Sequence, residues 1–285
     1  MKMSTRSIMC LLVLGVTLVF GLLGLHLTPT FLNWSGDILI NTVGGVSRSA
    51  DPRVVLLLID EDSLAYGQKL GLGRWPWPRS IYAEILDFIN RSAPPKAVFF
   101  DILFSESDPV PANDTAFAEA IARSGNVVHN MLFASNPERK NELPLPQDVA
   151  ANFSINVSNA QSASFTWNRA NQYTLPLEIL RSVEAQTPIA LGLAMADFAP
   201  DTDGVYRRGR MLFAWGKETN RRYFPSLSLQ AIMALSGTTS VTVEGSTIRA
   251  GRYRIPLDGN GRTLVNYLPT PIPAWSMSAV MESAY

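Results

Sequence analysis

The chain has 285 residues, of which 47% are hydrophobic and 17% charged, so it has enough apolar side chain for a buried core. Its 24 basic and 24 acidic residues cancel, which argues against nucleic acid as a partner because that needs a basic face. One cysteine, Cys10, and two histidines, His26 and His129, exclude a disulfide framework and a His-rich zinc site. We therefore expect no cofactor and no metal site.

An uncharged apolar run extends from Ile8 to Leu27. Its roughly 20 residues, as a helix, span about 30 Å, the thickness of the hydrocarbon core of a bilayer. Lys2 and Arg6 precede it and no acid does, which places the N-terminus in the cytoplasm and the rest of the chain outside. A cleaved signal peptide is the alternative, but no Ala-x-Ala-like site follows. We expect an uncleaved, single-pass anchor in the cytoplasmic membrane.

Residues 28–52 are polar and predict a connector between the anchor and a folded domain over residues 53–285. The domain opens with a βαβ pattern, in which helix Ser80–Arg91 separates two apolar strands, Arg53–Asp60 and Lys96–Phe104. A right-handed crossover makes these strands parallel, so Asp60 and Asp101 should lie at the same edge of one sheet. Open α/β sheets bind ligands at that edge.

The middle of the chain continues the α/β pattern. We expect a helix over Asn113–Arg123, capped by Asn113 or Asp114 and stopped by Gly125, and then a strand over Asn126–Phe133. The polar, Pro-containing stretch Ala134–Gln172 predicts a long irregular insertion over the sheet edge.

The last part of the chain is richer in short strands and glycines. Helices are expected over Leu177–Glu184 and Pro225–Ser236, with a turn at Asp201–Gly204. Strands are expected at Ile189–Phe198, Val205–Trp215, Val241, Ile248, Tyr253–Ile255 and Thr263–Tyr267. The predicted fold class is α/β, with a mainly parallel sheet, flanking helices and a hairpin-rich C-terminal part, preceded by one transmembrane helix.

Arg79 lies in the first turn of the helix between the two aspartates, where a positive charge opposes the helix dipole. A nearby carboxylate would offset this, so we expect Arg79 to pair with Asp60 or Asp101. The trio is either an ion-pair clasp that ties a loop to the sheet or the floor of a ligand site. Trp75 and Trp77 either stack on a ring of the ligand or cover the core.

Three weaker patterns leave alternatives open. Glu61, Asp62, Glu106 and Asp108 suit either Ca²⁺ or a solvated turn. The arginines at 207, 208 and 210 suit either an anion site or a solvated sheet face. Asp60-x-Asp62 after a strand also partly matches the aspartate phosphohydrolases, in which one acid attacks phosphorus and the other protonates the leaving group. A Gly-Thr pair should follow there, and Ser63-Leu64 stands instead.

Six segments in a fixed order carry a stronger resemblance than any one of them alone. They are VVLLLIDEDSL from Val54, WPWPR at Trp75–Arg79, AVFFDILFSESDP from Ala97, TDGVYRRGRM from Thr202, YFPSLSLQAI from Tyr223, and YRIPLDGNGRTLVNY from Tyr253. Together, behind an N-terminal anchor, they resemble the type 2 CHASE domain, an extracytoplasmic sensor module associated with adenylate cyclases and histidine kinases.

The resemblance implies a periplasmic or external sensor without catalytic residues that binds an unknown small ligand for transmembrane signalling. Asp60, Arg79, Asp101, Trp75 and Trp77 are its candidate ligand-binding residues. We also expect a homodimer. Such domains are usually followed by one more core strand, transmembrane helices and a cytoplasmic output domain, so we expect the chain to be truncated at its C-terminus and its output domain to be missing. The alternatives are a membrane-tethered phosphoester hydrolase and a structural surface domain without a ligand.

Overall fold

The structure is a computed structural model that describes residues 14–16, 18–19, 21, 24, 49–139, 141–184, 192–193, 200–201, 203–268 and 271–284. The predicted connector before residue 49 and most of the predicted span Ile8–Leu27 lie outside these residues. Within them, no helix combines the length and apolar character needed to cross a bilayer. The chain divides into a small unit (Met1–Val54, Pro200–Val205 and Asn266–Pro273) and a large unit that contains every strand and helix from β1 onward.

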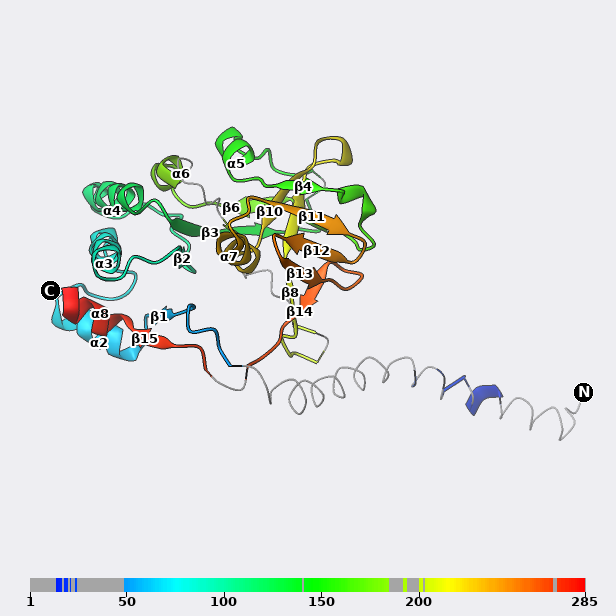
Figure 1. Cartoon of the computed structure of the whole chain (residues 1–285), viewed down its shortest axis with the longest axis horizontal. Coiled ribbons are helices and arrows are strands. Elements are labelled where there is room, and N and C mark those ends of the chain that lie inside the picture. The colour runs from blue at the N-terminus through cyan, green and yellow to red at the C-terminus, as the bar shows by residue number, and fades with distance from the viewer. Residues whose placement is uncertain are drawn as a thin grey trace, which may run out of the picture. The chain divides into compact units, whose positions relative to one another are not determined.

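The large unit begins with the predicted βαβ pattern plus one helix that the apolar pattern does not reveal. In chain order the elements are β1 (Leu56–Leu58), α2 (Glu61–Lys69), α3 (Arg79–Ser92), β2 (Val98–Phe100) and α4 (Pro111–Ser124) (Figure 1). The α3 helix is confirmed within one residue at each end. Both strands are shorter than predicted, and β2 is half-buried rather than buried on both faces.

The expectation that β1 and β2 share one sheet is wrong for the described residues. β1 pairs in parallel with β15 (Ala274–Ser276), and β2 pairs in parallel with β3 (Val127–Ala134). β15 comes more than 200 residues after β1 in the sequence and pairs with one edge of it. Its three residues, Ala-Trp-Ser, carry no strand periodicity, so the sequence gives no sign of this pairing.

The predicted cap of α4 is also wrong. The helix begins at Pro111, whose missing N–H suits the first helical position, and Val110 is its N-cap residue. Asn113 and Asp114 instead direct their side chains to Asp108, the residue three before the helix. The predicted stop is confirmed, because Gly125 adopts a left-handed backbone (φ 67°) that favours glycine.

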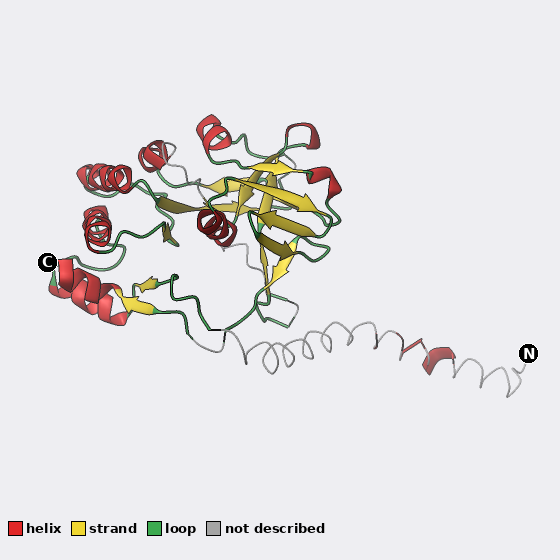
Figure 2. Ribbon diagram, viewed as in Figure 1, coloured by secondary structure: helices red, strands yellow, loops and turns green. Residues whose placement is uncertain are grey.

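β3 is the central strand of the α/β part. It pairs with β2 and with β7 (Gly192–Leu193) in parallel and with β6 (Gln172–Thr174) in antiparallel fashion. α6 (Glu178–Glu184) confirms the predicted helix, and of the predicted strand Ile189–Phe198 only residues 192–193 are described. Helices α3, α4 and α6 gather on one side of β3, and most of the short strands lie on the other (Figure 2).

The stretch Ala134–Gln172 is not the irregular insertion that its composition predicts. It contains α5 (Gln147–Asn152), β4 (Asn156–Ser158), the 3-10 turn η2 (Ala160–Ser162) and β5 (Asn168–Arg169). β4 pairs with β11 (Ser240–Glu244) and β5 with β9 (Leu212–Trp215), so the segment extends two sheets. A few buried apolar residues, among them Val149 and Phe153, anchor it, and the average composition hides them.

The C-terminal part confirms the predicted hairpins. The predicted strand Val205–Trp215 is split at Met211 into β8 (Arg208–Arg210), which pairs with β14 (Arg262–Leu264), and β9 (Leu212–Trp215), which pairs with β10 (Arg222–Pro225). α7 (Leu227–Ser236) follows, and then the meander of β11 (Ser240–Glu244), β12 (Thr247–Ala250) and β13 (Tyr253–Pro256). The sheets are therefore several, small and mixed rather than one that is mainly parallel.

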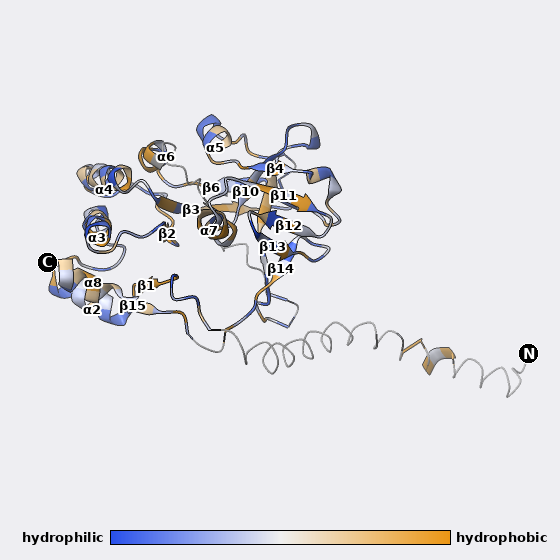
Figure 3. Cartoon of the chain, viewed as in Figure 1, coloured by the Kyte–Doolittle hydropathy of each residue, from blue (hydrophilic) through white to orange (hydrophobic). Residues whose placement is uncertain are grey.

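Four clusters of buried apolar side chains hold the large unit together. The first lies among α3, α4, α6 and β3, and two more lie under the hairpins and α7; β3 and α7 are among the most apolar elements of the chain (Figure 3). The fourth includes Trp77, Ile81, Met277 and Met281. It joins α2 and α3 to the last helix, α8 (Met277–Ala284).

Candidate functional site

Asp60 is the N-cap residue of α2, at the point where β1 ends. One of its carboxylate oxygens, Oδ1, accepts hydrogen bonds from the Ser63 backbone N–H at 3.0 Å, the Ser63 hydroxyl at 2.6 Å and the Ser276 hydroxyl at 2.7 Å. The Ser63 hydroxyl, and then that of Ser276, stabilise the charged form and lower the pKa of Asp60 to about 2.

Three serines complete this group, which we call the Asp60–serine cluster: Asp60, Ser63, Ser276 and Ser278. The backbone N–H of Ser278 donates to the Ser63 hydroxyl at 3.2 Å, and the hydroxyls of Ser276 and Ser278 lie 2.7 Å apart. Ser63 is fully buried. The cluster therefore ties the junction of β1 and α2 to the junction of β15 and α8.

Arg79 does not pair with Asp60 or Asp101, so that expectation is wrong. Its backbone N–H donates to Asp108 Oδ2 at 2.8 Å, and its guanidinium donates to the Glu106 carbonyl at 3.1 Å. Its Nε lies 3.9 Å from Asp114 Oδ1, beyond hydrogen-bonding distance. A carboxylate does offset the positive charge of Arg79 in the first turn of α3. It is that of Asp108, in the segment before α4.

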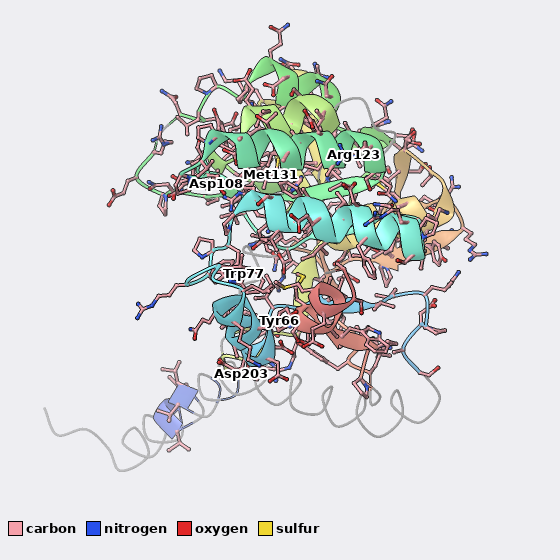
Figure 4. The ribbon with its side chains drawn as sticks, turned by 90° about the vertical axis from the view of Figure 1, so that its left-hand side faces the viewer. Tyr66, Trp77, Asp108, Arg123, Met131 and Asp203 are labelled. Atoms are coloured by element: carbon pink, nitrogen blue, oxygen red, sulfur yellow. The ribbon has the colours of Figure 1, made fainter. Side chains whose placement is uncertain are left out.

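Asp108, which is labelled in Figure 4, is the centre of this second group. We call the group the Arg79–Asp108 cluster: Arg79, Asp108, Asn113 and Asp114. Burial raises the pKa of Asp108, but hydrogen bonds from the backbone N–H groups of Val110 and Arg79 and from the Asn113 amide outweigh it. The pKa therefore lies below its ordinary value. The guanidinium also lies over the ring of Phe104, 4.6 Å from its centre. Only a tenth of the arginine side chain is exposed.

Asp101 follows β2 and is exposed. It accepts a hydrogen bond from the Asn130 amide at 3.1 Å. The residue before Asn130 is His129, and its ring stacks on that of Phe100 with a centroid distance of 5.1 Å. Asp60, Arg79 and Asp101 thus belong to three local groups. Within the described residues, they share no hydrogen bond or ion pair with one another.

The two tryptophans have different environments. Trp77 is only 1% exposed, and its ring lies so close to Gly67 that a Cβ there would meet it at 2.8 Å. It covers the core and presents no face to a ligand. Trp75 is 45% exposed, and its Nε1–H donates to the hydroxyl of Tyr82 at 3.1 Å. Of the pair, Trp75 alone keeps a surface on which a ring can stack.

The sequence pattern misses most of the residues around these groups. Asp60 as an N-cap has a readable signal, because acids at 61 and 62 and Lys69 near the end complement the dipole of a helix between them. Asp108, Asn113 and Asp114 carry no such signal, because their roles depend on where α4 packs. In the described parts of the chain, no three His, Cys, Asp or Glu side chains are placed to hold a metal ion.

The strands and helices define a mixed α/β domain in which buried polar groups are held by local hydrogen bonds. The chain belongs to the CHASE2 domain family, which matches residues 8–284. CHASE2 domains are sensor domains, typically extracytoplasmic in signalling proteins, and are not themselves catalytic. No curated protein and no solved structure shows significant similarity to the chain.

Proposed function

We propose that this chain is a membrane-anchored sensor whose residues 53–285 lie outside the cytoplasmic membrane and bind a small ligand for transmembrane signalling. Residues 1–27 form a cytoplasmic stub and the anchor, and residues 28–52 connect them to the domain. The family membership and the charge distribution around Ile8–Leu27 support this arrangement.

The Asp60–serine cluster is the observation that carries the proposal. It joins β1 and α2, the first strand and helix after the connector, to β15 and α8, more than 200 positions further along the chain. A ligand shifts a conformational equilibrium only when it binds one state more tightly than another. A domain in which two segments so far apart in the sequence share one hydrogen-bonded cluster transmits such a shift to both segments at once.

The hydrolase alternative has less support. Asp60 Oδ1 accepts three hydrogen bonds, and the residue caps a helix. To attack phosphorus, the carboxylate would first have to give up these structural hydrogen bonds. Asp60 is nevertheless a candidate ligand contact through its second oxygen. Trp75 is the other, through its exposed ring, whereas Arg79 and Asp101 belong to separate groups and Trp77 is buried in the core.

Two reporters fused after Tyr285 test the location. We expect an alkaline phosphatase fusion, active only outside the cytoplasm, to show activity and a β-galactosidase fusion, active only inside, to show none. The opposite pattern refutes an extracytoplasmic domain.

Hydrogen exchange of the full chain in nanodiscs tests sensing. The probes are single amino acids, sugars, dicarboxylates and inorganic phosphate, added one at a time. A ligand of the proposed kind changes protection in residues 56–64 and 274–284 together. A ligand that changes one segment alone, or a panel without any response, favours the structural alternative.

A further inference from the structure

A small hollow lies between β5, β8 and β14, and none of its lining residues belongs to the Asp60–serine cluster. Its volume is about 240 Å³, and it is lined by Thr166, Asn168, Arg210, Asn260 and Arg262. Each of these five side chains carries a hydrogen-bond donor and none is an acid. Ligand pockets for drug-sized molecules have about 300–1,000 Å³, so the hollow suits something smaller.

The strand register brings the two arginines together. β8 and β14 are antiparallel, and Arg210 is directly opposite Arg262. Residues opposite each other in an antiparallel pair project from the same face with Cβ atoms about 5 Å apart. Both guanidiniums therefore project from the same face of this strand pair, where they line the hollow.

Neighbouring groups hold both guanidiniums in place. The Nε–H of Arg210 donates to the Asn168 amide oxygen at 2.7 Å. Asp258 Oδ2 lies 3.1 Å from both Nε and Nη2 of Arg262, while Asp258 Oδ1 accepts the backbone N–H groups of Asn260 and Arg262. Fixed donors bind a ligand at a lower entropic cost than mobile ones.

The turn before β14 is packed tightly against the far wall of the hollow. Gly261 has a left-handed backbone (φ 67°), and a Cβ there would lie 3.0 Å from the Thr166 carbonyl and 3.1 Å from the Asn168 amide nitrogen. The amide of Asn168 donates back to the Gly261 carbonyl at 3.3 Å. The glycine therefore lets the turn carry Asn260 and Arg262 close to Asn168 and Arg210.

From these observations we infer that the hollow binds a tetrahedral oxyanion, either free phosphate or sulfate or the head group of a small phosphomonoester. Guanidinium groups form charge-assisted hydrogen bonds with the oxygens of such anions. Asn168, Asn260 and Thr166 supply neutral donors around them. The site does not depend on the proposed sensing role, because an anion bound here is detectable whatever the output of the chain.

Calorimetric titration of the full chain in nanodiscs tests the site at physiological ionic strength, where weak surface binding is screened. The probes are inorganic phosphate, sulfate and glycerol 3-phosphate. We expect saturable binding of phosphate at one site per chain. Tighter binding of glycerol 3-phosphate identifies a phosphomonoester site, and equal or weaker binding identifies a site for the free anion. The absence of saturable binding for all three overturns the inference.

Two variants and two matched controls locate the binding. Arg210→Gln removes one guanidinium, and Asn260→Asp places a carboxylate in the hollow by changing an exposed turn residue. Each is expected to weaken binding about tenfold or more, the equivalent of one hydrogen bond to a charged group. Arg252→Gln and Asn220→Asp make the same chemical changes at exposed positions away from the hollow, and should bind as the unmodified chain does.

Equal weakening by Arg252→Gln overturns the inference, since it indicates a general charge effect. If Arg210→Gln fails to fold, Asn260→Asp decides alone, because Asn260 is exposed and its side chain has no hydrogen bond within the described residues. Unchanged binding by Asn260→Asp then refutes the site. The reporter fusions measure on which side of the membrane the domain lies, and calorimetry measures anion binding. A negative result in one experiment is therefore distinct from a negative result in the other.

Discussion

Arg79 brings a positive charge to the start of a helix, where the helix dipole disfavours it, and nine-tenths of its side chain is buried. The compensation comes from Asp108, which accepts hydrogen bonds from three donors in two segments. A buried arginine held in this way fixes the loop before α4 to the first turn of α3. Asp101, by contrast, is exposed and has one neutral partner, Asn130.

These two aspartates should therefore differ in their effect on stability. Asp108→Ala leaves the backbone N–H groups of Arg79 and Val110 and the Asn113 amide without their acceptor, and we expect a loss of about 2 to 3 kcal/mol in the free energy of unfolding. Asp101→Asn keeps an oxygen that accepts from Asn130, and we expect a change within about 0.5 kcal/mol. Urea unfolding measures both. A larger loss for Asp101→Asn than for Asp108→Ala contradicts the assignment of Asp108 as the anchor of Arg79.

Asp60 predicts a pH dependence. Its pKa in the folded chain is about 2, below the unfolded value of about 3.9. The stability that its carboxylate contributes is therefore present above the unfolded pKa and lost as the pH falls through the folded pKa. We expect the difference in unfolding free energy between the unmodified chain and Asp60→Asn to be constant near neutral pH and to shrink between pH 4 and pH 2.

The control for this experiment is Asp62→Asn, at an exposed position two residues away. Its difference from the unmodified chain should be small throughout. A difference for Asp60→Asn that stays unchanged down to pH 2 shows that the charge of Asp60 does not stabilise the cluster.

At the scale of elements, α8 is the helix whose packing the sequence conceals most. Met281 is fully buried, in the apolar cluster that also contains Trp77 and Ile81. Met281→Ala removes apolar volume from this cluster, and we expect a loss of about 2 to 5 kcal/mol. Glu282→Ala, at the exposed neighbouring position, should cost no more than about 0.5 kcal/mol. Thermal or urea unfolding of the two variants compares them, and equal effects would show that α8 does not contribute to the core.

The elements that sequence predicts well are those specified by their own residues. The apolar stripe of α3 and the glycine that ends α4 are local signals, and both are confirmed. Pairing between strands is not local. β15 reaches β1 across most of the chain, and β4 and β5 are short polar segments that become strands only because β11 and β9 offer free edges.

The candidate site follows the same rule. Asp60 and Arg79 were recognisable as special from their positions next to a strand and in a first helical turn. Their partners were not, because Ser276 and Asp108 lie in other segments and meet them only after packing. The burial of Trp77 is also a packing result, since Trp75, two residues away in the same Pro-containing motif, is exposed.

At the scale of the whole molecule, the proposed anchor can be tested independently of the fold. If residues 8–27 remain in the membrane, the mature protein keeps its original N-terminus and resists extraction by alkaline carbonate. Mass spectrometry of the protein purified from membranes measures this. A mature N-terminus near Thr28 would show that the segment is a signal peptide, and Lys2→Glu with Arg6→Glu should disturb insertion by removing the positive charges.

The pairing of β1 with β15 has a consequence for the order in which the chain folds. The bond between Ser276 and Asp60 joins residues 216 positions apart, so β1 leaves the ribosome long before its partner β15. At about 5–20 residues per second, about 10 to 40 s of synthesis separate β1 from β15, and β1 lacks this partner during that time. Closing so long a loop is entropically costly and slow, so the step that seals the domain comes at the end. Until then β1 is an apolar strand without its partner, and such unpaired strands are sites of aggregation.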